Sequence, residues 1–252
     1  MRVFAVSDIH VDYIENREWL TQLSSVDYRQ DILILAGDVT DDLMILEECF
    51  AELADKFLKV LFVPGNHELW VSRDKIKDSI EKLKLVHNAA LAHGIAIAPF
   101  HIDGLSIVPL VSWYDFSFGE PSTQLLNTWT DFRACRWPNE MKPVQITSYF
   151  MAKNEEHLQI SNNTVISFSH FLPRIDLMPI YIPQVYRYIY PALGCVSLEQ
   201  QIRKLAPDIH VYGHSHVNRN VTFEGIQYIN NAFAYPSEKS ISKKRLLCIY
   251  EH

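Results

Sequence analysis

The sequence has few cysteines, and none of them forms a CxxC pair. Cys49, Cys135, Cys195 and Cys248 are scattered along 252 residues, mostly in apolar surroundings that suit a small buried thiol. The absence of thiolate pairs argues against a structural zinc knot. No feature of the sequence requires a disulfide.

Long apolar runs and long basic runs are also lacking. The N-terminal apolar run turns polar at Ser7, which makes it too short for a signal peptide, and no later run approaches the length of a membrane span. The formal net charge is −7, and the longest basic run is the triplet at 243–245. We therefore predict a cytoplasmic protein that binds neither a membrane nor duplex nucleic acid, whereas a small anion held by metal ions is compatible with this charge.

Short, β-branched apolar runs are what the sequence does contain. Their near-continuous apolar character predicts buried strands at residues 3–6, 32–36, 60–63, 95–98, 105–111, 165–168, 209–212, 221–229 and 246–250. Helical spacing of apolar residues lies between several of them, at 42–57 and 72–86. This alternation predicts an α/β fold with a largely parallel central region. Residues 221–229 are typical of a hairpin that turns at Glu224 and Gly225, so antiparallel pairing is expected near the end of the chain.

Two long segments interrupt this pattern, at about 113–143 and 171–194. Both are rich in Trp, Tyr, Phe and Pro and lack clear periodicity, so we interpret them as ordered insertions that shape a substrate site. Their aromatic side chains either line a substrate pocket or pack within the insertions or at a dimer contact. These aromatic candidates are Trp113, Tyr114, Tyr181, Tyr186, Tyr188 and Tyr190. Because no linker or repeat divides the chain, residues 1–252 are expected to form a single domain.

Metal-ligating residue types stand directly after five of the predicted strands. Open α/β sheets place ligand sites beyond the carboxyl ends of their strands, so these five segments are expected to converge. The donors are Asp8, His10, Asp38, Asn66, His170, His214 and His216. A mixed set of oxygen and nitrogen donors suits Mn, Fe, Zn or Ni. Seven donors exceed the needs of one tetrahedral ion, whereas two ions that share a carboxylate would use them all.

The sequence blocks that hold these donors resemble the motifs of the calcineurin-like metallophosphoesterase superfamily. They read DIH from residue 8, GDVTD from 37, GNHE from 65, a lone histidine at 170 and GHSH from 213, in the order that the superfamily shows. The resemblance implies a four-layer sandwich of two mixed sheets flanked by helices. Val11 and Asp42 stand where the protein Ser/Thr phosphatases of this superfamily carry glycine and arginine. The chain therefore looks more like the small-molecule phosphoesterases and class III phosphodiesterases.

The resemblance also implies a role for each donor. The first metal ion would be held by Asp8, His10 and His216, the second by Asn66, His170 and His214, and Asp38 would bridge the two. A hydroxide shared by the ions would attack phosphorus, while the ions neutralise charge on the phosphoryl oxygens. His67 would protonate the leaving group or clamp the phosphate, and Asp41 would orient His67.

Several other polar residues lie near these blocks or between them. Glu68 is expected to support its loop by hydrogen bonding rather than to bind metal. Arg174 is either a clamp for phosphate, joining Asn66 and His67 as substrate contacts, or part of a surface ion pair. His210 lies within a predicted strand and is interpreted as structural. The same interpretation applies to the histidines outside the blocks, which are His87, His93, His101, His157 and His252.

The sequence as a whole predicts a dinuclear metal-dependent hydrolase of phosphoester bonds, a phosphatase or phosphodiesterase, that acts on a small phosphorylated substrate and favours Mn or Fe. A nuclease or cyclic-nucleotide phosphodiesterase of the same superfamily is the first alternative, because the aromatic insertions could stack bases. A non-catalytic scaffold with this fold is the second, and the complete set of donors disfavours it. The natural substrate and the oligomeric state stay open.

Overall fold

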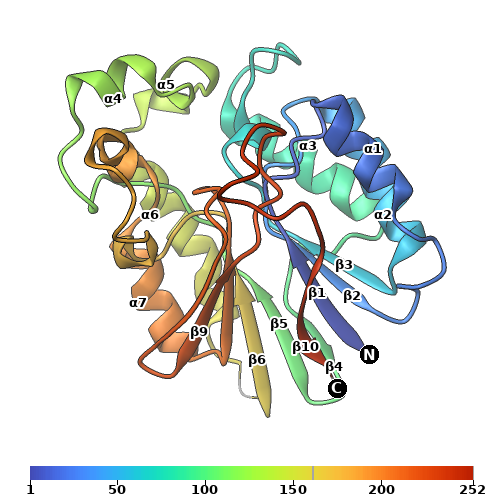
Figure 1. Cartoon of the computed structure of the whole chain (residues 1–252). Coiled ribbons are helices and arrows are strands. Elements are labelled where there is room, and N and C mark those ends of the chain that lie inside the picture. Colours follow the sequence, from blue (N-terminus) through green and yellow to red (C-terminus); the bar gives the residue numbers. More distant parts are fainter. Residues whose placement is uncertain (161, 252) are drawn as a thin grey trace.

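Two mixed β-sheets form the centre of the chain in the computed structural model, which describes residues 1–160 and 162–251 (Figure 1). The first sheet has the order β10-β1-β2-β3, with β1 at Arg2–Val6, β2 at Ile32–Leu35, β3 at Lys59–Phe62 and β10 at Leu247–Glu251. Strands β1, β2 and β3 are parallel, and β10 pairs antiparallel with β1. The predicted antiparallel end of the chain is thereby confirmed, and His252 lies outside the described residues.

The second sheet has the order β4-β5-β6-β7-β9-β8. Its strands are β4 at Phe100–Ile102, β5 at Leu105–Pro109, β6 at Thr164–Phe168, β7 at Ile209–Tyr212, β8 at Arg219–Phe223 and β9 at Ile226–Asn230. The four central strands are parallel, and β4 and β8 pair antiparallel at the edges. Strands β8 and β9 form the predicted hairpin, in which Glu224 and Gly225 both have positive φ.

Helices cover the outer face of each sheet and complete four layers. In Figure 1, α1 at Ile14–Gln22, α2 at Leu43–Lys56 and α3 at Ser79–Ala92 lie beside the first sheet, whereas α6 at Pro143–Asn154 and α7 at Val196–Leu205 lie beside the second. The shorter helices are α4 at Thr123–Thr128, α5 at Asp131–Ala134, η1 at His67–Leu69, η2 at Pro138–Glu140, η3 at Glu155–His157, η4 at Ile175–Leu177 and η5 at Gln184–Ala192. This architecture confirms the predicted α/β sandwich.

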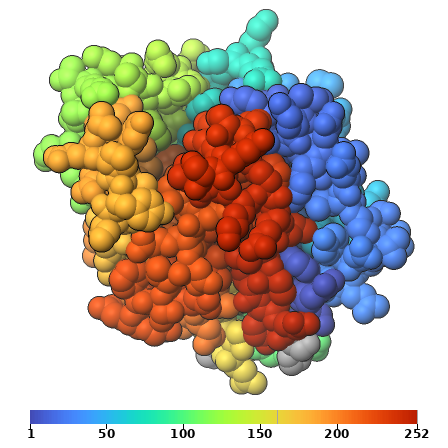
Figure 2. All heavy atoms as spheres, in the orientation of Figure 1, coloured from blue at the N-terminus to red at the C-terminus, as the bar shows by residue number. Residues whose placement is uncertain are grey.

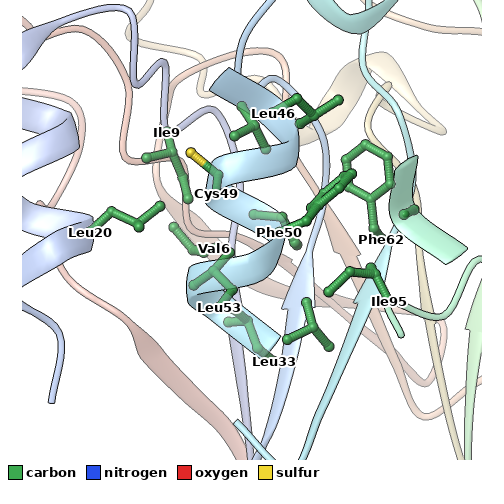
Figure 3. Packing of buried hydrophobic residues seen from close by; sticks show 14 of the residues in the cluster. Val6, Ile9, Leu20, Leu33, Leu46, Cys49, Phe50, Leu53, Phe62 and Ile95 are labelled. Atoms are coloured by element: carbon green, nitrogen blue, oxygen red, sulfur yellow. The ribbon is translucent and has the colours of Figure 1, made fainter. Parts of the chain in front are cut away.

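Alternation of side chains along the strands explains the layers. Val3 and Ala5 of β1 face the second sheet, while Phe4 and Val6 face the helices. Figure 3 shows the helix side of this core, where α2 lays one apolar face against the first sheet. The side chains from α2 are Leu46, Cys49, Phe50 and Leu53. Burial of each large apolar side chain stabilises the fold by about 1.5–3 kcal/mol, so both faces of each sheet must be covered.

Two sequence predictions are wrong, one about a strand and one about the start of a helix. Residues 95–98 form no strand and contribute only a single bridge between Ala96 and Leu61. The helix predicted at 72–86 begins instead at Ser79, because the Asp78 carboxylate accepts the backbone N–H groups of Ile80 and Glu81 and caps it there. Apolar periodicity alone does not mark such a cap, so the predicted start was seven residues early.

The first insertion shares an apolar cluster with α3, α6 and the second insertion. Trp113 and Tyr114 are each 1% exposed and belong to a cluster with Phe150 and Phe171. In the second insertion, η5 contacts α4 of the first, and Figure 2 shows the two segments meeting on one side of the molecule, in green and orange. The insertions therefore form a continuous wall beside the carboxyl ends of the strands.

Candidate metal centre

The predicted metal ligands converge from both sheets. Asp8, His10, Asp38 and Asn66 follow strands of the first sheet, and His170, His214 and His216 follow strands of the second. Five of them have a left-handed backbone, with φ between 47° and 66°: Asp8, His10, Asp38, His214 and His216. This conformation is uncommon for residues with a side chain and clusters at functional sites, where surrounding contacts hold it.

One group of ligand atoms comes from Asp8, His10, Asp38 and His216. All four residues are buried, and one donor atom of each lies within 4.8 Å of the others. The Nε2 atoms of His10 and His216 are 3.1 Å apart, and His216 Nε2 lies 3.3 Å from Asp8 Oδ1. These atoms surround a space that suits one cation.

A second group comes from Asp38, His170 and His214, with Asn66 beside them. His170 Nε2 lies 3.4 Å from Asp38 Oδ2, 3.1 Å from His214 Nδ1 and 3.2 Å from Asn66 Oδ1. Because Asp38 belongs to both groups, its carboxylate lies between two possible cation positions. The structure thus brings together all seven predicted donors.

Hydrogen bonds on the far side of each ring decide which nitrogen faces the centre. Nδ1 of His170 contacts the Ala36 carbonyl at 2.9 Å, and Nε2 of His214 contacts the Ala192 carbonyl at 3.1 Å. A carbonyl oxygen only accepts, so His170 Nδ1 and His214 Nε2 both carry hydrogen. The other ring nitrogen of His214, Nδ1, then has no hydrogen and presents a lone pair. At most one proton, on His170 Nε2, can then lie among three acceptors. A cation satisfies all of these lone pairs at once, so the residues fit a metal ion.

Charge in the ion-free chain is balanced by protons on two of these rings. Burial acts to lower the pKa of His170, but the Asp38 carboxylate outweighs it and raises that pKa to about 9. Burial is likewise outweighed at His216, where Asp8 and then Glu238 raise the pKa to about 10. Burial dominates at His214 and lowers its pKa to about 3. A metal ion must displace the protons on His170 and His216, because a ligating nitrogen needs its lone pair.

Two glycines permit this close packing of ligands. A Cβ at Gly65 would lie 2.1 Å from Asp38 Oδ1, and a Cβ at Gly213 would lie 2.7 Å from Asp8 Oδ2. Neither distance is possible for a side chain. These glycines are required by the approach of carboxylates to the backbone.

Glu68 fastens the two loops that carry Asp38 and Asn66. Its buried carboxylate accepts four backbone N–H groups, from Gly65 at 2.7 Å, Asp38 at 3.0 Å, Val39 at 2.6 Å and Thr40 at 3.2 Å. Burial and then the Asp38 charge raise the pKa of Glu68 to about 7, against the effect of these donors. These contacts match the loop-supporting role expected from the sequence.

His67 lies at the edge of the ligand cluster. Its backbone N–H donates to Asp38 Oδ1 at 3.0 Å, and its ring stacks on Trp70 with centroids 3.7 Å apart. The Asp41 carboxylate pairs with the Arg73 guanidinium at 2.8 Å and not with the His67 ring. Asp41 and His67 line the same cavity, so the orienting role of Asp41 stays a prediction.

Two cavities meet at His67 and Tyr235, which line both. The metal cavity has a volume of about 220 Å³ and is walled by five of the residues above, Asp38, Asn66, His67, His214 and His216, together with Trp129, Ile189, Ser215, Tyr235 and Glu238. The Arg73 cavity has a volume of about 340 Å³ and is lined by His10, Asp12, Tyr13, Asp41, His67, Trp70, Arg73, Thr130 and Tyr235. Each insertion contributes a side chain to the metal cavity, Trp129 from the first and Ile189 from the second.

Arg174 and most of the aromatic candidates lie elsewhere. The Arg174 guanidinium pairs with Asp176 at 2.7 Å and Glu199 at 3.3 Å, which is the ion-pair alternative, and its substrate role stays a prediction. Trp113 and Tyr114 are core residues, while Tyr181 is 71% exposed. Trp113 and Tyr114 therefore pack in the core and do not line a substrate pocket.

The histidines interpreted as structural are also separate from the cluster. His210 is fully buried within β7, where its ring nitrogens contact Ser167 Oγ at 2.8 Å and Ser169 Oγ at 3.1 Å. His101 and His157 contact Ser106 and the Pro109 carbonyl. Among the described residues, neither metal-ligating group includes them or His87 or His93.

Two carboxylates of the site, the half-buried Glu238 and the buried Asp131, were not predicted from the sequence. Glu238 Oε2 lies 2.7 Å from His216 Nδ1 and fixes the tautomer of that ring. Asp131 accepts a hydrogen bond from Asn66 Nδ2 at 2.9 Å. Both residues are remote in sequence from the ligands they contact, and neither stands in a recognisable motif.

Two mixed sheets in four layers, with buried aspartates and histidines gathered at the carboxyl ends of their strands, define a metal-dependent phosphoester hydrolase. The chain belongs to the calcineurin-like phosphoesterase family, whose sequence pattern matches residues 1–218. The family that the motifs resemble is thereby confirmed. Across residues 1–160 and 162–251, no helix combines the length and apolar character needed to cross a membrane.

Individual relatives extend this result. The chain is 23% identical to the [acyl-carrier-protein] phosphodiesterase PptH of Mycobacterium tuberculosis, over 94% of this chain and 78% of the relative. The crystal structure of phosphopantetheinyl hydrolase (PptH) from the same organism superposes with a TM-score of 0.84 and 22% identity, over 98% of this chain and 95% of that one. Purple acid phosphatase PPD1 from yellow lupin gives a TM-score of 0.50 and 12% identity, over 91% of this chain and 43% of that one. The structural likenesses establish a shared fold.

Proposed function

We propose that this chain is a phosphodiesterase that releases a phosphopantetheine group from a carrier protein. The observation that carries the proposal is the pair of cavities that meet at His67 and Tyr235. A phosphodiester has an organic group on each side of phosphorus, so its site needs room on both sides of the reacting centre, whereas a monoester needs one. The names of the relative and of the superposed structure, which describe hydrolysis at a modified carrier protein, supply the substrate class.

In this proposal the centre would hold two metal ions. Asp8, His10 and His216 would hold the first ion, Asn66, His170 and His214 would hold the second, and Asp38 would serve both. When bound, the ions supply Lewis acidity toward the phosphoryl oxygens and activate water. Nitrogen and oxygen donors of this kind suit Mn or Fe, and thiolates, which would favour other metals, do not contribute.

The residues of the chain then orient the substrate and move one proton. His67 lines both cavities, so its imidazole can donate a proton to a leaving oxygen on the side of the Arg73 cavity. Stacking on Trp70 holds the ring in place, because a stacked ring cannot rotate freely. Asp41 pairs with Arg73 and lines the same cavity as His67, so it would orient the His67 ring from within that cavity.

The remaining parts of the chain fit the same proposal. Residues 1–252 act as one unit, and the insertions at 113–143 and 171–194 shape the metal cavity through Trp129 and Ile189. A cytoplasmic location accords with four cysteines that are all free thiols. Carrier proteins bearing a phosphopantetheine group are then the partners.

Mass spectrometry of a carrier protein tests the proposal directly. Incubation of the modified carrier with the Mn-loaded chain should remove the phosphopantetheine group, and Asp38→Asn should abolish both this reaction and metal binding. Bis(p-nitrophenyl) phosphate should react faster than p-nitrophenyl phosphate, because only the diester fills both cavities. Preference for the monoester, or faster turnover of cyclic AMP or single-stranded DNA than of the modified carrier, would contradict the proposal.

A further inference from the structure

The first insertion places one buried carboxylate, Asp131, directly behind a metal ligand. Asp131 is the first residue of α5 and is 3% exposed. Its Oδ1 accepts Asn66 Nδ2 at 2.9 Å and the indole N–H of Trp70 at 2.7 Å, and its Oδ2 accepts the indole N–H of Trp129 at 2.8 Å. All three donors belong to side chains that line the two cavities.

We infer that Asp131 is a positioning residue, which fixes the oxygen of the Asn66 amide toward the second metal position and holds Trp70 against His67. This inference rests on the proposed function, in which Asn66 is a ligand. It gives the first insertion a role in the centre itself, in addition to shaping the cavity.

The chemistry of the amide explains why such a residue is needed. A carboxamide has an oxygen on one side and an NH2 group on the other, and only the oxygen can bind a cation. Asp131 as a carboxylate only accepts, so it holds the NH2 group of Asn66 and leaves Oδ1 facing His170 Nε2 at 3.2 Å. Rotation of the amide by half a turn would place two oxygens together at Asp131 and an NH2 group at the metal position.

The same carboxylate extends its effect to His67. Trp70 donates to the oxygen that also holds Asn66, and its indole stacks on the His67 ring with centroids 3.7 Å apart and planes inclined by 29°. The position of the ring that moves the proton and the orientation of the amide ligand therefore depend on one side chain.

Metal binding to purified variants of the full chain tests this inference. Asp131→Leu removes both acceptor oxygens at similar size, so we expect the affinity for one of two Mn ions to fall by about 10–100-fold while the other is retained. Asp131→Asn keeps one acceptor oxygen and should give a smaller loss. The readout is Mn bound per chain in equilibrium dialysis over a range of free Mn concentrations.

Ser79→Ala is the matched control. Ser79 is buried, donates to the Leu69 carbonyl at 2.8 Å and accepts the backbone N–H of Arg136 at 3.1 Å, so it also ties the first insertion to η1. It contacts no metal ligand in the described part of the chain, and Ser79→Ala should lower the free energy of unfolding without changing Mn affinity.

A swapped pair distinguishes positioning from simple stabilisation. In a chain that carries Asn66→Asp, the added change Asp131→Asn should raise the affinity for the second ion, because the introduced amide then donates to the introduced carboxylate. The same Asp131→Asn change lowers affinity in the native background, and this reversal of sign also carries the test if Asp131→Leu fails to fold.

The outcomes separate the two proposals. Native protein that binds fewer than two ions would refute the proposed dinuclear function. If the native protein binds two ions, two results would overturn the role of Asp131. The first is native affinity for both ions in Asp131→Leu and Asp131→Asn, and the second is a loss of affinity in Ser79→Ala as large as in Asp131→Leu.

Discussion

The facing nitrogens of His170 and His214 lie 3.1 Å apart, although each ring uses its other nitrogen to contact a backbone carbonyl. Two lone pairs at this distance repel one another unless a proton or a cation lies between them. The carbonyls of Ala36 and Ala192 therefore act on the centre without touching it, because they decide which atoms are free to bind metal.

Removal of single histidines should separate the ligands from the structural residue of the same segment. His214→Ala and His216→Ala should each lower Mn content by one ion or more and abolish hydrolysis, because each removes a donor nitrogen from one group. His210→Ala should leave metal content unchanged and lower the free energy of unfolding, because His210 contacts Ser167 and Ser169 within the sheet. Elemental analysis and urea denaturation measure the two effects. Metal loss in His210→Ala alone would reverse the assignment.

Replacement of Glu68 by glutamine should damage the centre without removing a donor. Four backbone N–H groups donate to the two oxygens of the carboxylate, whereas an amide has only one acceptor oxygen. The free energy of unfolding should therefore fall by at least about 2 kcal/mol. Because the loops of Asp38 and Asn66 then separate, Mn affinity should fall as well. Calorimetry of the metal-free and metal-bound protein measures both changes.

Glu199→Gln is the control for this effect. Glu199 accepts the Tyr228 hydroxyl and pairs with Arg174 and Arg203, and none of these three residues is a predicted metal ligand. It should lower stability and leave Mn affinity unchanged. An equal loss of metal in both variants would show that general loosening, rather than the two loops, is responsible.

The role of His67 predicts an effect that depends on the leaving group. His67→Ala keeps the backbone bond to Asp38 Oδ1, so two metal ions should still bind. Hydrolysis of an ester with an alkyl leaving group should slow by about 10²–10⁴-fold, because that oxygen needs a proton. Bis(p-nitrophenyl) phosphate, whose leaving group is already stable as an anion, should be much less affected. Equal losses on both substrates would indicate phosphate clamping instead.

His210 makes the stability of the fold depend on pH in a defined direction. Burial lowers its pKa to about 3 in the folded chain, against about 6.5 when unfolded. Between these values the unfolded chain binds one more proton, so stability is full above about pH 6.5 and falls as the pH drops toward 3. Metal-free native protein should lose about 2 kcal/mol more than His210→Gln between pH 7.5 and pH 5. Urea denaturation of both at the two pH values measures this difference, and parallel losses would contradict the assignment.

The gathering of the seven predicted donors could be expected from the sequence because each donor follows a strand that the sequence itself marks. An apolar β-branched run followed by Asp8, or by Gly213 and His214, marks both a strand and its carboxyl end. Parallel pairing then brings such ends together. The layers follow from the same runs, because apolar residues on both faces of a strand require cover on both sides.

Other parts of the structure depend on contacts that no local pattern records. Asp131 reaches Asn66 across 65 positions, and Glu238 reaches His216 across 22, so neither could be recognised from its neighbours in the sequence. The start of α3 was misplaced because the cap at Asp78 and the bonds of Ser79 to Leu69 and Arg136 outweigh apolar spacing. Sequence patterns report strands and helices, whereas these features arise when distant segments meet.

The seven donors stand on loops of two different sheets, which pack through the apolar side chains between them and are also joined by backbone hydrogen bonds at Ser7, whose N–H donates to the Asn231 carbonyl at 3.2 Å. Ions bound across that junction act as cross-links within a single chain. We therefore expect metal supply to set the lifetime of this protein as well as its rate. A chain starved of metal should open between its halves and become sensitive to proteases, so that the cell clears inactive copies first.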